Sequence, residues 1–326
     1  MRRKIIIVFA VLFILVLGVS NCSAGATDYP TRDITYIVPY NPGGSTDPIS
    51  RKFATCLEKT LPGTVNVVNK PGGSATIGIG SVVRSNPDGY TIGFGTNGAL
   101  AYQPQVTPGL AWKTPDDYQS IVKLIDMPVI LVVRADAPWK TFEEFIADVR
   151  KNPGKIRVSN SGFGAMGDMC IKQLNKAAGI KMTSVGLSTG GGEAMIALLG
   201  GRVEACASYT PNTMSFYKAG KVKVLGVFKK GKYDSFPEAT PIGDSYDATL
   251  TGMYFVLGPN GIPNDVLDKL INASLRAVKM PEFIDFAKSN GYVPEAKGPD
   301  GVKKELVNYH AMYAEILKDM KEEQKK

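Results

Sequence analysis

Residues 34–48 read ITYIVPYNPGGSTDP, and this stretch decides the fold. Ile34–Val38 is β-branched and aromatic, which is typical of a strand. A turn rich in glycine and proline follows, and apolar residues then recur at helical spacing from Ile49 to Leu61. Asp47 is expected to cap this helix, with Pro48 at its first position. A strand, a glycine-rich loop and a helix in this order predict an α/β fold with parallel strands.

The same order recurs along the chain. Further strands are predicted at residues 65–68, 91–95, 129–133, 156–158, 184–185, 203–207, 222–228 and 253–257. Further helices are predicted at residues 142–152, 168–178, 193–199, 264–279 and 302–321. The chain is therefore expected to form two α/β lobes with crossings near Arg134 and Thr249. The first lobe takes residues 28–133 and resumes at residues 250–326, and the second lobe takes residues 134–249.

Residues 1–21 have the features of a secretory signal peptide. Three cations precede an apolar run at residues 5–17, which is shorter than the roughly 20 residues of a transmembrane helix. Residues 19–22 read VSNC and resemble a bacterial lipobox, which would make Cys22 the lipidated N-terminus. Cleavage by an ordinary signal peptidase near residues 22–24 is the alternative, and a retained membrane anchor is less favoured. The mature chain is expected outside the cytoplasmic membrane, in the periplasm or at the cell surface, anchored by Cys22.

Composition excludes several classes of protein. The chain has 326 residues, enough for about two domains, and its 44% hydrophobic and 21% charged residues are typical of folded soluble proteins. Loss of the three leader cations lowers the formal net charge from +8 to +5, and no long block of like charges occurs, so no nucleic-acid partner is expected. A single histidine, His310, excludes zinc sites that need two, and no metal is expected. Cys56, Cys170 and Cys206 are predicted to be buried thiols, with one bridging pair as the alternative.

Catalytic and cofactor motifs are incomplete. GxGxxG occurs at residues 93–98 and 162–167, but neither copy has the acid that a dinucleotide site needs within an unbroken βαβ unit, so no cofactor is expected. Residues 226–233 nearly form a Walker A loop, in which Tyr233 replaces the magnesium-binding hydroxyl. No GxSxG nucleophile motif is present. The chain is therefore expected not to be an enzyme, and a secreted hydrolase is the less favoured alternative.

Three glycine-rich loops at helix starts are candidate anion sites, at residues 43–47, 161–165 and 189–192. Their small side chains leave backbone N–H groups able to point at a ligand, beside the partial positive charge of a helix N-terminus. For any single loop, a simple tight turn is the favoured alternative. Three loops in two lobes favour a shared site, because loops at the carboxyl ends of strands converge on one crevice. Gly44 and Gly164 are expected to allow the closest approach.

Four motifs carry a resemblance to a known family: residues 38–47 (VPYNPGGSTD), 68–73 (VNKPGG), 86–91 (NPDGYT) and 197–203 (ALLGGRV). With them the chain resembles, over about residues 29–318, the Bug-type extracytoplasmic solute receptors of tripartite tricarboxylate transporters. The resemblance implies a two-lobed periplasmic binding protein fold, or Venus flytrap, in which each lobe is a mixed sheet flanked by helices. It also implies that small carboxylates are bound through main-chain amides, hydroxyls and waters rather than by an arginine clamp.

The resemblance makes residues 43–47 the ligand loop of the first lobe and residues 161–165 that of the second. The expected ligand-binding residues are Tyr40, Asn41, Gly43, Gly44, Ser45, Thr46, Asp47, Thr96, Asn97, Ser161, Gly162, Gly164, Ala165, Thr189 and Gly190. Asp168 stands where the family usually has histidine, and Leu187 and Ser188 stand where it often has Tyr-Lys. These changes make the second lobe less cationic, so a tricarboxylate such as citrate is less expected.

The resemblance thus predicts a monomeric binding protein that captures a small carboxylate between two lobes. The ligand class is a di- or tricarboxylate or a related organic or amino acid. The expected partners are the two membrane subunits of a tripartite transporter, to which the ligand is delivered. A ligand-sensing partner of a membrane signalling protein, using the same closure, is the alternative.

Overall fold

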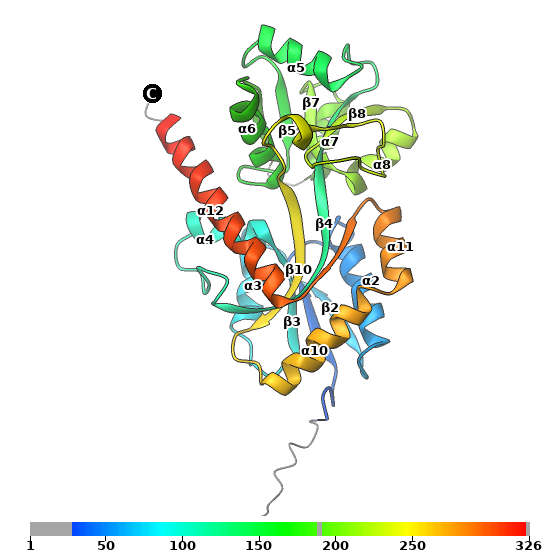
Figure 1. The fold of residues 1–326 in the computed structure, drawn as a ribbon, viewed down its shortest axis with the longest axis vertical. Helices are drawn as coiled ribbons and strands as arrows, with labels where there is room; N and C mark the ends of the chain where they lie inside the picture. Colours follow the sequence, from blue (N-terminus) through cyan, green and yellow to red (C-terminus); the bar gives the residue numbers. More distant parts are fainter. Residues whose placement is uncertain (1–27, 188–190, 324–326) are drawn as a thin grey trace, which may run out of the picture.

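The computed structural model describes residues 28–187 and 191–323. The predicted signal peptide and Cys22 lie outside the described residues. Two lobes are stacked along the long axis of the molecule (Figure 1), and two neighbouring antiparallel strands, β4 (Tyr118–Arg134) and β10 (Thr251–Pro259), connect them. No helix within the described ranges is apolar over enough of its length to span a bilayer.

The first lobe contains a mixed sheet with the strand order β2-β1-β3-β10-β4. Its strands besides β4 and β10 are β1 (Ile34–Val38), β2 (Val65–Asn69), β3 (Thr91–Thr96) and β11 (Val293–Lys297). Its helices are α2 (Asp47–Glu58), α3 (Thr76–Val83), α4 (Gln103–Val106), α10 (Asn264–Ala277), α11 (Pro281–Ser289) and α12 (Pro299–Glu323). β1, β2 and β3 are parallel, whereas β10 pairs antiparallel with β3 and β4. β10 therefore joins two strands that lie far from it in the sequence.

The second lobe repeats the parallel pattern around the far half of β4. Its other strands are β5 (Arg157–Asn160), β6 (Thr183–Gly186), β7 (Ala205–Tyr209), β8 (Val222–Val227) and β9 (Thr240–Pro241). Its helices are α5 (Phe142–Lys151), α6 (Met166–Ala178), α7 (Gly191–Leu199), α8 (Thr210–Lys218) and α9 (Ile242–Ser245). β5 is parallel to β6 and β7, and β4 pairs antiparallel with β7 and β8. The predicted α/β fold with two mixed sheets is thus confirmed.

β4 differs most from the sequence prediction, because it is one continuous strand of 17 residues. The sequence predicted a strand only at residues 129–133. In the structure, residues 118–128 pair with β10, and residues 129–134 pair with β7 and β8. The exchange of partners falls at Pro128 and Val129 rather than at Arg134. The lobe boundaries proposed from the sequence stay a prediction.

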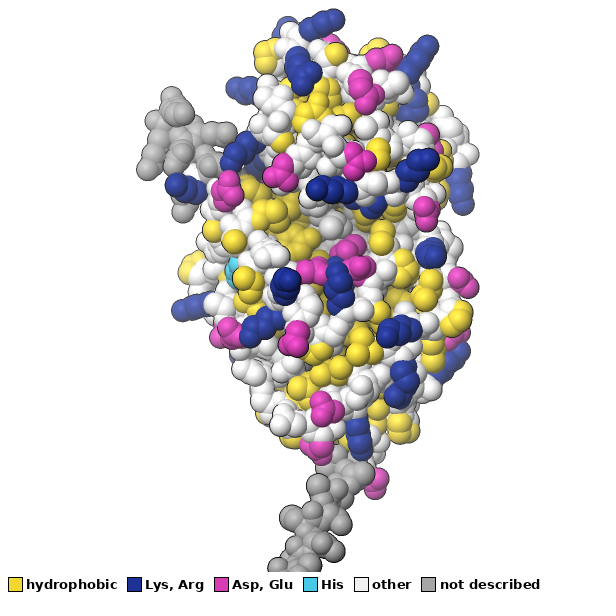
Figure 2. Space-filling view, in the orientation of Figure 1, with side chains coloured by type: hydrophobic (Ala, Val, Ile, Leu, Met, Phe, Trp, Pro, Cys, Tyr) yellow, Lys and Arg dark blue, Asp and Glu magenta, His cyan; other side chains and the backbone are white. Residues whose placement is uncertain are grey.

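A cluster of charges around the buried Lys123 explains why the sequence did not predict the first half of β4 as a strand. The Lys123 side chain is only 2% exposed, and its Nζ lies 2.9 Å from Asp126, 3.1 Å from Glu295 and 2.7 Å from Glu305. Lys297 also contacts both glutamates. The charged residues interrupt the apolar pattern of β4, although their mutual pairing lets them lie in a buried strand. Figure 2 shows acidic and basic side chains gathered at the waist of the molecule.

Two shorter differences have local causes. The predicted helix at residues 264–279 ends at Ala277, and a separate helix, α11, begins at Pro281. Proline suits the first turn of a new helix because its missing N–H has no acceptor there. α6 begins at Met166, two residues before the predicted start at Asp168.

The long C-terminal helix α12 runs from the first lobe toward α6 of the second (Figure 1). Lys176 of α6 forms an ion pair with Glu315 of α12, at 3.0 Å. The ring of Tyr313 packs edge-on against Tyr102, which belongs to the short helical segment Gly98–Tyr102 of the first lobe. α12 therefore contacts both lobes on one side of the molecule.

The cluster around Lys123 predicts a pH-dependent stability. Burial, with smaller contributions from Glu305 and Glu295, raises the pKa of Asp126 to about 6 despite the opposing Lys123. Between about pH 4 and 6 the folded protein therefore holds a proton that the unfolded chain releases, so acidification adds stability through this group. We expect wild type to gain about 1 kcal/mol relative to Asp126→Asn when the pH falls from about 7 to about 5.

Thermal unfolding of both proteins across this pH range checks the prediction. Asp88→Asn is the control, since it removes a carboxylate that pairs with Arg32 at the surface. A difference between wild type and Asp126→Asn that does not change with pH would contradict it.

Candidate ligand-binding site

The first predicted ligand loop lies between β1 and α2 and is held by Asp47. Its carboxylate accepts hydrogen bonds from the Gly43 amide at 3.1 Å, from Asn69 Nδ2 at 3.0 Å and from Arg51 Nε at 3.1 Å. Burial raises the pKa of Asp47, but these hydrogen bonds outweigh burial and hold the pKa below its usual value. The expected cap is corrected: α2 begins at Asp47 itself, after Thr46. The carboxylate instead bonds back to the loop and fixes its shape.

The amides of Gly44, Ser45 and Thr46 have no acceptor among the described residues. They precede the N-terminus of α2, where the helix dipole favours an anion. A Cβ on Gly44 would meet only the Asn41 carbonyl, at 3.5 Å, so this part of the loop is open. The Gly43 amide is already bound by Asp47 and is not available to a ligand. Three successive amides of the loop are therefore candidate donors to an anion.

Tyr40, Thr96 and Asn97 lie beside this loop. Tyr40 Oη lies 3.1 Å from Thr96 Oγ1. The buried Asn97 side chain donates to the Thr251 carbonyl at 3.0 Å and accepts from the Met253 amide at 3.2 Å. Asn97 thus ties the end of β3 to the start of β10, and its side chain is engaged in the fold.

The second predicted loop lies between β5 and α6 and is held by Asp168. This fully buried carboxylate accepts from the Gly164 amide at 2.9 Å, from Lys172 Nζ at 2.7 Å and from Ser184 Oγ at 2.6 Å. The Gly162 amide donates to Asn160 Oδ1 at 2.9 Å, and the Ala165 amide donates to the Gly162 carbonyl. Of the predicted residues of this loop, Ser161 is the one whose amide has no acceptor within the described chain.

Gly164 has a different role from the one expected. Its φ is +74°, and a Cβ at this position would overlap the Tyr102 ring of the first lobe. The glycine therefore permits contact between the two lobes, rather than an open approach for a ligand. Thr189 and Gly190, the remaining predicted residues, lie outside the described residues.

The same arrangement of hydrogen bonds and an ion pair holds both loops. In each lobe the amide of a loop glycine donates to the carboxylate of an aspartate four residues later. A cationic side chain four residues after the aspartate forms an ion pair with it. The residues are Gly43, Asp47 and Arg51 in the first lobe, and Gly164, Asp168 and Lys172 in the second. The third partner comes from the neighbouring parallel strand, as Asn69 of β2 or Ser184 of β6. The repeated spacing was visible in the sequence. Each carboxylate is neutralised, so neither loop presents net charge through it.

Sequence reasoning missed several tyrosines that lie where the lobes meet. Tyr209 ends β7 of the second lobe and lies close to Tyr254 of β10. Burial raises the pKa of both phenols, so they stay protonated donors at neutral pH. No motif marks these residues, because only the folded arrangement of the strands brings them together.

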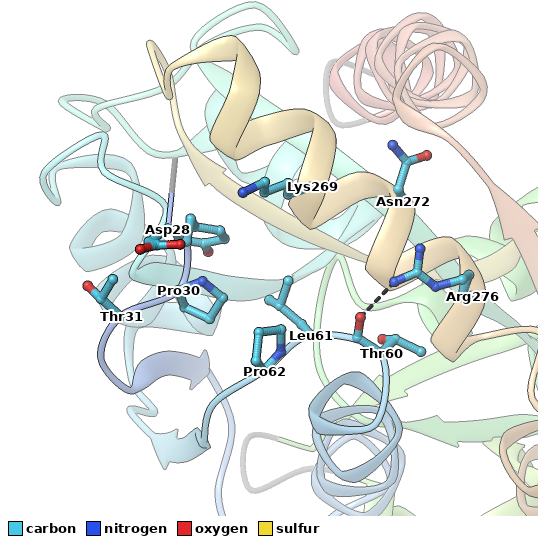
Figure 3. Close-up of a pocket in the computed structure, with 10 residues that line it drawn as sticks. Asp28, Pro30, Thr31, Thr60, Leu61, Pro62, Lys269, Asn272 and Arg276 are labelled. Carbon is cyan, nitrogen blue, oxygen red and sulfur yellow. Dashed lines mark hydrogen bonds between the residues drawn. The ribbon is translucent and has the colours of Figure 1, made fainter. Parts of the chain in front are cut away.

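One surface cavity lies away from both loops. It has a volume of about 620 Å³ and is lined by residues 28–31, by residues 60–62 and by α10, where Arg276 donates to the Thr60 carbonyl at 2.6 Å (Figure 3). A smaller cavity of about 190 Å³ lies beside α7. Neither contains a predicted ligand-binding residue of the first or second loop. Over residues 28–187 and 191–323, no group of three or more His, Cys, Asp or Glu side chains is arranged to hold a metal ion.

Comparisons with known proteins identify relatives of this arrangement. A UPF0065 protein of Agrobacterium vitis, from the TAR-I ttuE-ttuC' intergenic region, is 33% identical over 276 residues, which cover 82% of this chain and 78% of the relative. The solved periplasmic binding protein BugD is 27% identical, with a TM-score of 0.75 over 89% of this chain and 98% of its own.

Two further solved structures share the fold and contain ligands. The Rpa4515 protein of R. palustris, solved with adipate, is 22% identical with a TM-score of 0.79, covering 89% of this chain and 98% of its own. MatC of Rhodopseudomonas palustris, solved with bound malate, is 23% identical with a TM-score of 0.75, covering 88% and 99%.

The receptor family of the tripartite tricarboxylate transporters matches residues 49–318. This range includes most of α2, every strand after β1 and most of α12. The chain therefore belongs to the tripartite tricarboxylate transporter receptor family, and its fold is that of the periplasmic solute-binding proteins of this type.

Proposed function

We propose that this protein captures a small carboxylate between its two lobes and delivers it to the membrane subunits of a tripartite transporter. The observation that carries the proposal is the first loop, where three successive amides that have no acceptor in the described part of the chain stand at the N-terminus of α2. The ligands of the two neighbours, adipate and malate, support the choice of a small carboxylate.

The proposed recognition uses backbone dipoles rather than a cationic side chain. The amides of Gly44, Ser45 and Thr46 donate to one carboxylate group, and the α2 dipole adds to the attraction. Arg51 and Lys172 are paired with Asp47 and Asp168, so they act on the loops and not as a clamp on the ligand. Ser161, with the predicted residues Thr189 and Gly190, supplies the second-lobe contacts.

Ligand binding is expected to favour the closed arrangement. A ligand that contacts both lobes shifts the protein toward the state it binds better, and binding to the folded state raises its stability. With a panel of malate, adipate, glutamate and citrate, we expect at least one acid to raise the melting temperature and to reduce the radius of gyration in X-ray scattering. If no acid does so, and native mass spectrometry detects no co-purified small acid, the proposed function is wrong.

Gly44 provides a direct test of recognition by amides. Its Cβ position is open, so Gly44→Val is expected to fold normally while placing two methyl groups in the path of the ligand. Loss of one charge-assisted hydrogen bond costs about 1.5 to 3 kcal/mol, so we expect the dissociation constant to rise at least about tenfold in calorimetric titration.

The controls for Gly44→Val are Lys70→Ala and Arg202→Ala, which remove exposed cations and should change affinity little. Gly164→Val is not suitable as a second test variant, because its side chain would displace Tyr102. If either cation variant abolishes binding and Gly44→Val binds normally, a side-chain clamp must replace the amide mechanism.

We further propose that Cys22 is lipidated and holds the receptor at the membrane surface. Acyl chains contribute about 0.8 kcal/mol of membrane affinity per buried CH₂, so two chains anchor a protein firmly. Cys22→Ala should move the protein from the membrane fraction to the soluble fraction after cell lysis. A wild-type protein that is already soluble would exclude the anchor.

A further inference from the structure

Tyr233 makes a hydrogen bond between the two lobes. It follows β8 in the second lobe, is only 4% exposed, and donates its hydroxyl to the Gly291 carbonyl. Gly291 lies in the turn between α11 and β11, which belongs to the C-terminal part of the first lobe. The Thr210 hydroxyl lies 2.7 Å from Tyr233 Oη and is left to donate to it. The contact is buried, so water does not compete for these groups.

The turn at Gly291 fits only a glycine. Its φ is +75°, and a Cβ there would overlap the fully buried side chain of Thr210. Both the backbone conformation and the missing side chain are therefore needed for the lobes to approach this closely.

The next residue in the chain reaches the first ligand loop. Tyr292 is 3% exposed and donates its hydroxyl to the Ser45 carbonyl. Ser45 lies in the middle of the three amides that have no acceptor among the described residues. Two consecutive residues, Gly291 and Tyr292, therefore connect the second lobe to the ligand loop of the first.

We propose that Thr210, Tyr233, Gly291 and Tyr292 form a latch that couples closure of the lobes to the conformation of the ligand loop. The inference deepens the proposed function, on which its ligand-binding consequence rests. When the lobes close, Tyr233 fixes the Gly291 carbonyl, and the adjoining Tyr292 holds Ser45 so that the loop amides point in one direction. Coupling of this kind is reciprocal, so an ordered loop also favours the closed latch.

The latch predicts an effect without any ligand. Tyr233→Phe keeps the ring and removes the hydroxyl that crosses between the lobes. Because a typical hydrogen bond contributes modestly to stability, we expect the ratio of closed to open protein to fall about fivefold. Thr210→Val, which keeps the shape of the side chain, should shift the ratio in the same direction and serves as the second variant if Tyr233→Phe folds poorly.

The ratio is measured by electron–electron distances between spin labels on cysteines introduced at the exposed positions Lys151 of α5 and Lys288 of α11. Tyr217→Phe is the matched control: Tyr217 also lies in the second lobe and bonds Glu238 Oε1 at 2.6 Å, but its bond does not cross between the lobes. Tyr233→Phe should give longer and broader distances, and Tyr217→Phe should match wild type.

Hydrogen exchange tests the coupling to the loop. In ligand-free protein, the loop amide of Gly43, which donates to Asp47, should exchange faster in Tyr233→Phe and in Tyr292→Phe than in wild type or Tyr217→Phe. If Tyr233→Phe and Thr210→Val leave the distances unchanged, the latch does not exist. If the lobes open and loop exchange stays at the wild-type rate, the contact is not coupled to the loop, and the proposal is also wrong. Neither result depends on a ligand, so neither decides the proposed function.

Discussion

A single strand, β4, supplies backbone hydrogen bonds to the sheets of both lobes. Its first part pairs with β10 and its last part pairs with β7 and β8, so β4 is a strand of both sheets. β4 is continuous from one lobe to the other, without a loop that could serve as a hinge. Motion of one lobe relative to the other must therefore bend β4 and its neighbour β10. The loops, the buried tyrosines and α12 are all positioned with respect to this pair of strands. The charge cluster around Lys123 lies on the same strand, just before the partners change.

The candidate site combines local rigidity with little net charge. Asp47 and Asp168 each accept a hydrogen bond from a loop amide and form an ion pair with a nearby cation. These contacts hold the loop in place, and the ion pair neutralises the carboxylate. What remains for a ligand is a set of backbone amides and hydroxyls. Such groups are held in place by the fold, so they need little reorganisation when an anion arrives.

Local patterns in the sequence predicted much of this arrangement. The ITYIV strand, the glycine loop and the helix after it are all present, because propensity and tertiary structure agree there. The start of β4 was missed, since Lys123 and Asp126 look like surface residues until Glu295 and Glu305 join them from far along the chain. In the sequence, Tyr233 was notable only because it replaces the hydroxyl residue of a Walker A motif at residues 226–233. Its contact with Gly291 spans the two lobes, and no local pattern predicts such a contact.

The placement of β10 also sets the order in which the chain can assemble. Strands β5 to β9 of the second lobe follow one another along the chain, whereas the first sheet lacks its middle strand until residues 251–259 have been synthesised. Until then β3 and β4 each have an unpaired edge, which is a template for aggregation. Closing the sheet also requires contacts between residues far apart in sequence, which slows folding. The sheet of the first lobe is therefore the one that stays incomplete for longer while the chain is made.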